Sequence, residues 1–155
     1  MYSISTATAA DMKDIHGLIT ELAVYEKAPD AVIISANDLE RDFNAGLFEA
    51  LVATEDATGK TVGMALYYPR YSTWKGPTLH LEDFYIQPAH RQNGLGMQIF
   101  DRVARIAAAK NVGRMEWTVL EWNTPALNFY QKIGADLDSE WHLGTLTREQ
   151  LKAWK

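Results

Sequence analysis

The chain has 155 residues, 47% of them hydrophobic and 23% charged, with a formal net charge of −5 and no cysteine. This length and composition are typical of one compact domain, so we expect a single domain over residues 1–155. The acidic balance argues against a nucleic-acid partner, and the absence of a long apolar run or a secretory leader argues against a membrane partner and predicts a cytoplasmic location.

Two capping-box signals, in which a Ser or Thr precedes an acidic residue by three positions, predict helices in the first third of the chain. The first follows a short strand over residues 2–5 and begins an amphipathic helix that runs to about Tyr25. The second begins a shorter helix, which Gly46 can end. The two pairs are Thr8 with Asp11 and Ser35 with Asp38.

The middle of the chain has the residue pattern of β-strands. Two β-prone runs at 50–55 and 61–68 are joined by turn residues and predict an antiparallel hairpin, and a third strand is expected at 78–86. A helical period over 94–111 and a further strand at 115–122 complete a strand, crossover helix and strand unit. The two strands of that unit should be parallel.

The last part of the chain has weaker signals. A helix over 124–134 begins with Thr-Pro and ends with Gly, a last strand is expected at 137–146, and Thr147 with Gln150 caps a terminal helix. The whole pattern predicts an α+β fold with a mixed sheet.

A short glycine-containing loop, RQNGLG, lies between the strand at 78–86 and the following helix. It lacks the lysine of a Walker phosphate loop, and Ile99 stands where a dinucleotide-binding fingerprint has its third glycine. Backbone amides at such a helix start point at one volume, and the helix dipole favours an anion there. The loop therefore predicts an anion site made by Arg91, Gly94 and Gly96, where missing side chains let a diphosphate approach; the alternative is a tight turn without a ligand.

Residues 85–100, YIQPAHRQNGLGMQIF, resemble the signature of the GNAT superfamily of acetyltransferases, whose R/Q-x-x-G-x-G/A loop holds the pyrophosphate of acetyl-CoA. Four further blocks, ELAVYEKAPD, YYPRYSTWKG, LHLEDFYI and EWNTPALNFYQKIGA, resemble the spermidine/spermine (diamine) acetyltransferase subfamily in order along nearly the whole chain. The resemblance implies a three-layer fold with a mixed, mostly antiparallel central sheet, flanking helices and a parallel, splayed strand pair around the crossover helix.

The same resemblance implies an enzyme that uses acetyl-CoA to acetylate the primary amine of a small cationic substrate, such as spermidine or spermine, by direct attack in a ternary complex. The splayed strand, the glycine loop and the start of the helix before Tyr130 would contact acetyl-CoA. The implied contacts are Phe84, Tyr85, Ile86, Arg91, Gln92, Asn93, Gly94, Leu95, Gly96, Met97, Asn123, Thr124, Pro125, Ala126 and Tyr130.

Two residues match catalytic positions of the resembling enzymes. An alkylammonium with a pKa near ~10.4 is almost wholly protonated at neutral pH, so a proton acceptor is needed. Glu82 matches the glutamate that serves the amine, through water, and regular strand alternation would point it away from Asp83. Tyr130 matches the tyrosine that acts as general acid toward the leaving thiolate, with hydrogen bonding as the alternative to full proton transfer.

The resemblance also implies amine contacts by Tyr25, Glu26, Glu82, Asp83 and Glu140. This sequence departs from the polyamine enzymes at Ser72, where those enzymes carry an aspartate. Lysine-like amino acids such as thialysine are therefore an alternative substrate class. A protein amine and a non-catalytic acyl-CoA-binding module are further alternatives.

Two further expectations concern the quaternary state of the protein and its metal content. The diamine enzymes are homodimers, so a homodimer is expected. The histidines have no metal-ligand spacing, so no metal is expected.

Overall fold

The computed structural model describes residues 1–154. They form two compact units, Met1–Thr118 and the residues from Val119 onward. The first unit is built on one mixed sheet in the order β1-β2-β3-β4-β5, in which the first three pairs are antiparallel and β4 with β5 is parallel. The strands are β1 (Tyr2–Thr6), β2 (Glu49–Glu55), β3 (Lys60–Ser72), β4 (Gly76–Ile86) and β5 (Arg114–Glu116).

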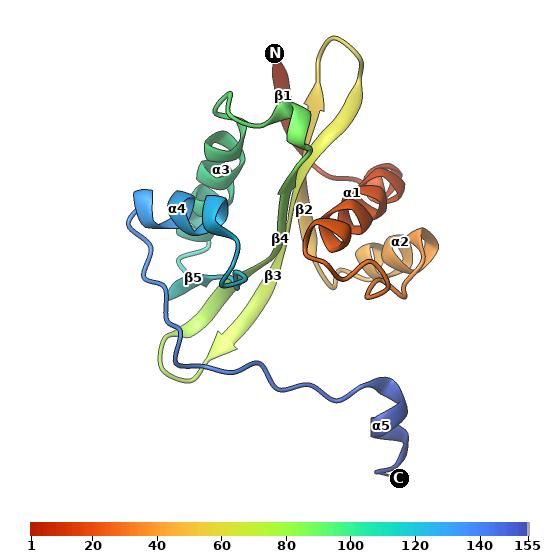
Figure 1. Cartoon of the computed structure of the whole chain (residues 1–155), viewed down its shortest axis with the longest axis vertical. Coiled ribbons are helices and arrows are strands. Elements are labelled where there is room, and N and C mark those ends of the chain that lie inside the picture. Colours follow the sequence, from red (N-terminus) through yellow and green to blue (C-terminus); the bar gives the residue numbers. More distant parts are fainter. Residues whose placement is uncertain (155) are drawn as a thin grey trace. The chain divides into compact units, whose positions relative to one another are not determined.

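Helices cover both faces of this sheet. Figure 1 shows α1 (Met12–Tyr25) and α2 (Ala36–Asn44) on one face and the crossover helix α3 (Leu95–Ala109) on the other. Two short 3₁₀ helices, η1 (Ala9–Asp11) and η2 (Pro88–His90), precede α1 and α3. The first unit thus has three layers with a parallel crossover, and the predicted α+β class is confirmed.

Local sequence signals explain where these elements begin. At α2 the amide of Asp38 donates to Ser35 Oγ at 3.1 Å, and the amide of Ser35 donates back to the Asp38 carboxylate at 2.9 Å. This reciprocal pair satisfies two helix-end donors and confirms the predicted capping box. The pair Thr8 and Asp11 forms a second capping box ahead of α1.

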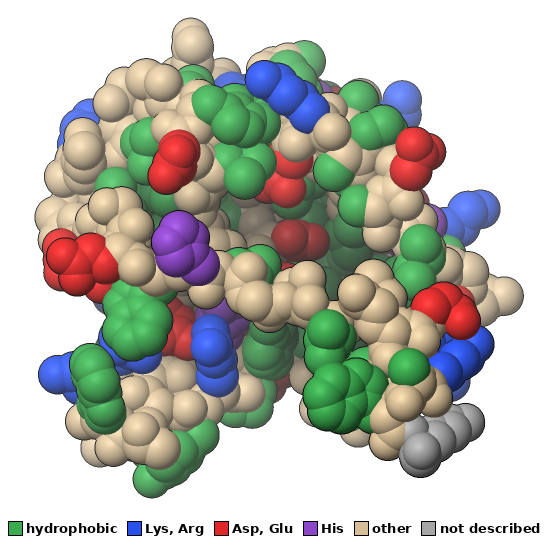
Figure 2. All heavy atoms as spheres, turned by 60° about the horizontal axis from the view of Figure 1, so that its bottom comes forward, with side chains coloured by type: hydrophobic (Ala, Val, Ile, Leu, Met, Phe, Trp, Pro, Cys, Tyr) green, Lys and Arg blue, Asp and Glu red, His purple; other side chains and the backbone are tan. Residues whose placement is uncertain are grey.

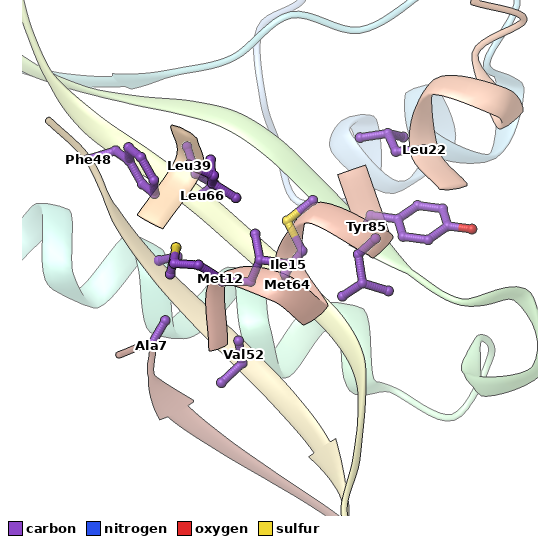
Figure 3. Close-up of a cluster of buried hydrophobic side chains, with 12 residues drawn as sticks. Ala7, Met12, Ile15, Leu22, Leu39, Phe48, Val52, Met64, Leu66 and Tyr85 are labelled. Atoms are coloured by element: carbon purple, nitrogen blue, oxygen red, sulfur yellow. The ribbon is translucent and has the colours of Figure 1, made fainter. Parts of the chain in front are cut away.

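The core between the sheet and the first two helices contains fully buried side chains. Met12 and Ile15 of α1 pack with Val52 of β2 and Met64 of β3 (Figure 3), and all four are at most 3% exposed. Burial of each such side chain stabilises the fold by about 1.5–3 kcal/mol. This packing fixes α1 on the sheet and therefore fixes its C-terminal end, where Tyr25 lies.

The ladder between β3 and β4 contains an irregularity at Glu82. Leu66 pairs with Asp83, and the next residue, Tyr67, pairs with Leu81, so Glu82 has no opposite residue in β3. One extra residue on one strand is a β-bulge, which bends the strand and breaks its alternation. The two carboxylates of β4 are located at this bulge.

The parallel ladder between β4 and β5 is short. It contains three pairs and ends at His80 with Glu116, whereas β4 continues to Ile86. The predicted strand at 115–122 is therefore wrong beyond Glu116. The bulge at Glu82 lies two residues after the last pair, and Trp117 packs edge-on against Phe100 of α3, with ring centroids 5.4 Å apart.

The second unit contains α4 (Thr124–Lys132) and α5 (Arg148–Lys152). Both predicted helices are confirmed, and Gly134 has φ +81°, the left-handed conformation that often follows a helix end. The predicted strand at 137–146 is wrong, because the described residues there pair with no strand. Its apolar side chains, such as Leu143, are largely exposed, so no core face directs the segment into a sheet.

Candidate active site

The glycine loop forms the N-terminal end of α3. Gln92 and Gly94 have φ of +66° and +82°, so the chain passes twice through the left-handed region before the helix begins. The first i to i−4 hydrogen bond of α3 runs from Gln98 N to Gly94 O at 3.2 Å. The amides of residues 95–97 lie at this helix end; the Leu95 amide donates to Asn93 Oδ1 at 3.4 Å, and those of Gly96 and Met97 are in the position that can serve an anion.

The two glycines of this loop have different structural roles. Gly94 supplies the positive φ that a residue with a side chain rarely adopts. A Cβ on Gly96 would lie 3.4 Å from Ile86 Cδ1 and 3.7 Å from Phe84 Cζ. Both distances are ordinary van der Waals contacts, so a Cβ at Gly96 would fit against β4. That the missing side chain at Gly96 lets a diphosphate approach stays a prediction.

Replacing Gly94 with alanine should weaken coenzyme A binding. A side chain at φ +82° costs about 1–2 kcal/mol and shifts the backbone away from this conformation, which misaligns the amides at 95–97. We expect the Kd for coenzyme A to rise about tenfold by titration calorimetry. Gly46→Ala is the matched control, since Gly46 has φ +74° after α2 with nothing within 4 Å; equal affinities for the two variants would contradict the anion site.

Arg91 is exposed, and it also contacts the end of β4 and the end of α1. Its Nε donates to the carbonyl of Ile86 at 2.7 Å, and its guanidinium lies 5.2 Å and 5.3 Å from the ring centroids of Tyr25 and Tyr85. These contacts tie the end of β4 to the end of α1. Pairing of Arg91 with a phosphate stays a prediction.

Tyr2 supports the other side of the loop, which the sequence did not indicate. Its hydroxyl accepts from Asn93 Nδ2 at 2.9 Å and lies 3.0 Å from His90 Nδ1. A contact across about ninety residues leaves no local pattern, so only the fold reveals it. Phe84, Tyr85 and Ile86 lie on β4 beyond its last pair with β5, as the predicted splay requires.

The bulge places both carboxylates of β4 on one face of the sheet. Leu66 and Tyr68 are two residues apart on β3 and share a face, so their partners Asp83 and His80 share it as well. Glu82 accepts a hydrogen bond from the Tyr68 hydroxyl at 2.7 Å, so it faces the same side. The expectation that Glu82 points opposite to Asp83 is therefore wrong, because it assumed an unbroken alternation.

The electrostatics of this face are strongly negative. Burial, followed by the charges of Glu82 and Glu26, raises the pKa of Asp83 to about 6. Burial also raises the pKa of Glu26 above its ordinary value. The hydrogen bond from His80, and a smaller one from Tyr68, hold the pKa of Glu82 below its ordinary value against the opposing effect of burial. A bound cation would relieve the repulsion among these carboxylates.

His80 is the residue that the sequence analysis missed. It was considered only as a metal ligand, whereas the structure places its ring 3.3 Å from Glu82 and 3.4 Å from Glu116. The spacing of His80 and Glu82, two apart on one strand, was the available signal. Among residues 1–154 no three His, Asp or Glu side chains form an arrangement that could hold a metal ion.

The remaining predicted site residues belong to the second unit. Tyr130 of α4 is buried, and burial raises the pKa of its phenol to about 12. Asn123 caps α4 by accepting from the Ala126 amide at 3.4 Å, with Thr124 and Pro125 in the first turn. Glu140 is exposed, and its amide donates to Asp138 at 2.8 Å. Their part in the site stays a prediction.

The first unit combines a glycine loop at a helix start, a short parallel strand pair beyond which β4 continues, and a cluster of carboxylates. Residues 12–135 match the model of the Acetyltransferase (GNAT) family, and the chain belongs to this family.

Curated relatives are similar over most of this chain. The human spermidine/spermine N(1)-acetyltransferase-like protein 1 is 39% identical over 99% of this chain, which spans only 24% of that relative's length. The thialysine N-epsilon-acetyltransferase of Bos taurus is 38% identical, and the match covers 90% of this chain and 88% of the relative.

Solved structures share the fold at low sequence identity. An integron cassette protein from V. cholerae has a TM-score of 0.77 at 24% identity, over 99% of this chain and 96% of that one. An aminoglycoside acetyltransferase from an uncultured soil metagenomic sample has a TM-score of 0.79 at 17% identity, over 94% and 97%. These likenesses confirm the GNAT fold.

The remaining surface features of residues 1–154 are their charge distribution and the character of their helices. On the face drawn in Figure 2, Lys and Arg side chains stand among Asp, Glu and apolar ones. Among the described helices, none combines the length and the apolar character that crossing a membrane requires.

Proposed function

We propose that this protein transfers the acetyl group of acetyl-CoA to the primary amine of a small cationic substrate, by direct attack in a ternary complex. The observation that carries the proposal is a group of three carboxylates, Glu26, Glu82 and Asp83. Glu82 and Asp83 lie on one face of the sheet, and burial, followed by the charges of Glu82 and Glu26, raises the pKa of Asp83 to about 6. Such a group favours an alkylammonium over a neutral or anionic acceptor.

The loop at 91–97 fits the diphosphate of acetyl-CoA. Gln92 and Gly94 have positive φ, which turns the loop at the start of a 15-residue helix, and the first-turn amides of that helix are donors of the kind that a diphosphate needs. When bound, acetyl-CoA supplies the thioester carbon that the amine attacks. The main chain of Phe84–Ile86, beyond the end of β5, would orient the pantetheine arm and the carbonyl.

Individual side chains would remove the proton, attract the cation and stabilise the thiolate. Glu82 takes the proton of the ammonium, directly or through water, and Asp83 with Glu26 attracts the cation. Tyr130 would hydrogen-bond the departing thiolate. These roles are inferred from the family and from the positions of the residues in their own units.

The acceptor test is a panel of spermidine, spermine, putrescine, L-lysine and thialysine with acetyl-CoA, followed by thiol release. Turnover with at least one amine is expected. Tight coenzyme A binding with no turnover, or turnover only with peptide amines, would replace the proposal with the non-catalytic module or the protein acetyltransferase.

A lysine-like amino acid is the second candidate acceptor. Ser72 Oγ accepts hydrogen bonds from the amides of Trp74 and Lys75, each at 3.2 Å, so this residue closes the β3–β4 turn and offers no carboxylate for a distal ammonium. The similarity to thialysine acetyltransferases over 90% of the chain points the same way. A preference for thialysine over spermidine in kcat/KM would select this acceptor.

Amine affinity should depend on pH through Asp83. Its pKa of about 6 means that this carboxyl becomes neutral as the pH falls below 6, which removes one attraction for the cation. We expect the KM for the amine to rise about fourfold from pH 7.5 to 5.5. Asp83→Asn should raise KM at pH 7.5 and remove this dependence, whereas Asp101→Asn on the exposed face of α3 should leave it unchanged.

We also propose a cytoplasmic homodimer, which rests on the resemblance to diamine acetyltransferases. Light scattering of the purified protein tests the dimer, and a mass near 17.5 kDa would contradict it.

A further inference from the structure

His80 lies between two carboxylates at the point where β4 and β5 separate. Its Nε2 is 3.3 Å from Glu82 Oε2, and its Nδ1 is 3.4 Å from Glu116 Oε1. His80 and Glu116 are the last pair of the parallel ladder, so the backbone fixes this approach. The three residues Glu82, His80 and Glu116 thus form a row. The imidazole is 9% exposed and Glu82 is 50% exposed, so the row leads from solvent to a buried ring.

Every charged or titratable group that faces this ring can be assigned to one of three strands. From β3, Tyr68 lies beside the imidazole, with ring centroids 5.2 Å apart, and Arg70 Nη1 is 3.4 Å from Nδ1. From β5, Glu116 also binds Arg70 at 2.9 Å and Arg114 at 2.7 Å. Glu82 comes from β4 itself.

These partners satisfy the ring in both protonation states. In the neutral form, Nε2–H donates to Glu82 and Nδ1 accepts from Arg70, or Nδ1–H donates to Glu116 and Nε2 is free to accept. In the imidazolium form, both N–H groups face carboxylates. When Nδ1 carries a proton, Arg70 can no longer donate to it and keeps its ion pair with Glu116, and Nε2 can then accept a further proton. Imidazole exchanges protons in the neutral pH range.

Glu82 alone is a weak acceptor for the proton that acetyl transfer releases. In the tautomer that carries Nε2–H, the hydrogen bond from His80 holds the pKa of Glu82 below its ordinary value. In the tautomer that carries Nδ1–H, Nε2 faces Glu82 at 3.3 Å and can accept a proton from it. Glu116 is held by two arginines and is suited to stabilise a cation beside it.

We propose that His80 is a positioning and relay residue that receives, at Nε2, the proton that Glu82 takes from the substrate ammonium. The N–H bond of the ammonium breaks, an O–H bond forms on Glu82, and that proton moves to Nε2 of the tautomer whose Nδ1–H faces Glu116. After the neutral amide leaves, the proton returns through Glu82 to solvent. This inference rests on the proposed function and adds a residue to it.

The test compares the purified wild-type protein with His80→Gln, Glu116→Gln and the control His16→Gln, in thiol-release assays between pH 6.5 and 9.5. The substrates are acetyl-CoA and spermidine, or thialysine if spermidine is not acetylated. A glutamine amide at position 80 can still donate to Glu82, so it preserves a purely structural role but cannot carry a proton. His16, whose Nε2 lies 2.8 Å from the Ile34 carbonyl, is a half-buried histidine outside the row.

We expect His80→Gln to lower kcat about 10- to 100-fold at pH 7 with the KM for acetyl-CoA unchanged. The deficit should shrink toward pH 9.5, where about a tenth of the amine is already neutral. Glu116→Gln should lower kcat about 3- to 10-fold with the same trend. If His80→Gln fails to fold by circular dichroism, Glu116→Gln carries the test.

The results that would overturn the relay differ from those that would overturn the proposed function. Wild-type-like kcat in the row variants, or a deficit that is equal at all pH values, would overturn the relay while the proposed function stands. A wild-type protein that acetylates none of the amines would overturn the proposed function and the relay with it. Loss of coenzyme A binding in the row variants alone would show a structural role and would also overturn the relay.

Discussion

Glu82→Gln is expected to lower kcat/KM for the amine at pH 7 by about 10²- to 10⁴-fold. At this pH at most about one amine molecule in a thousand is neutral, so the reaction depends on a group that removes the proton from the ammonium. Glutamine keeps the size of Glu82 and can still contact Tyr68 and His80, but it neither accepts a proton nor attracts a cation. Steady-state kinetics with the best amine of the panel measure the loss.

The control for this change is Glu40→Gln, an exposed glutamate of α2. It should leave kcat/KM within twofold of the wild type. Thermal unfolding of both variants should be similar to that of the parent, since Glu82 is half exposed and lies at a bulge. A Glu82→Gln protein with full activity at pH 7 would remove this residue from the mechanism.

Tyr130→Phe is expected to lower kcat about 10- to 10³-fold while the KM values change little. The pKa of the phenol is about 12, whereas a thiol has a pKa near ~8.5, so complete proton transfer to the thiolate would be uphill by about 5 kcal/mol. Tyr130 is therefore expected to stabilise the leaving thiolate through a hydrogen bond, which phenylalanine cannot make.

This role has a signature in the pH profile. Because the phenol stays protonated throughout the range from pH 7 to 10, its ionisation should not limit kcat on the alkaline side. Tyr71→Phe, at a tyrosine that is 71% exposed on β3, is the matched control and should retain wild-type kcat. An alkaline loss of activity with a midpoint near pH ~10 that disappears in Tyr130→Phe would instead indicate a phenol with an ordinary pKa.

Helices with local signals were predictable from the sequence. The capping boxes at Thr8 and Ser35 and the apolar period over 94–111 each depend on residues within one turn or a few turns of each other. The hairpin of β2 and β3 was predictable for the same reason, because its turn residues lie between two β-prone runs.

The geometry of the site was less predictable, since it depends on pairing between strands. Whether Glu82 occupies a bulge is decided by the register of β4 against β3, which no residue of β4 specifies alone. The early end of β5 and the absence of a strand at 137–146 have the same origin: a strand forms only where a partner edge is available. The contact of Tyr2 with the glycine loop likewise exists only in the folded chain.

The bulge at Glu82 lets β4 carry one carboxylate more than its pairing with β3 requires. Asp83 lies opposite Leu66 and Leu81 lies opposite Tyr67, so Glu82 is the one extra residue. A chain that lacks Glu82 would keep Asp83 and His80 on the same face in a regular ladder, because side chains alternate with a period of two. A deletion at this position would therefore remove one carboxylate and the bend of the strand together, whereas a substitution removes the carboxylate alone.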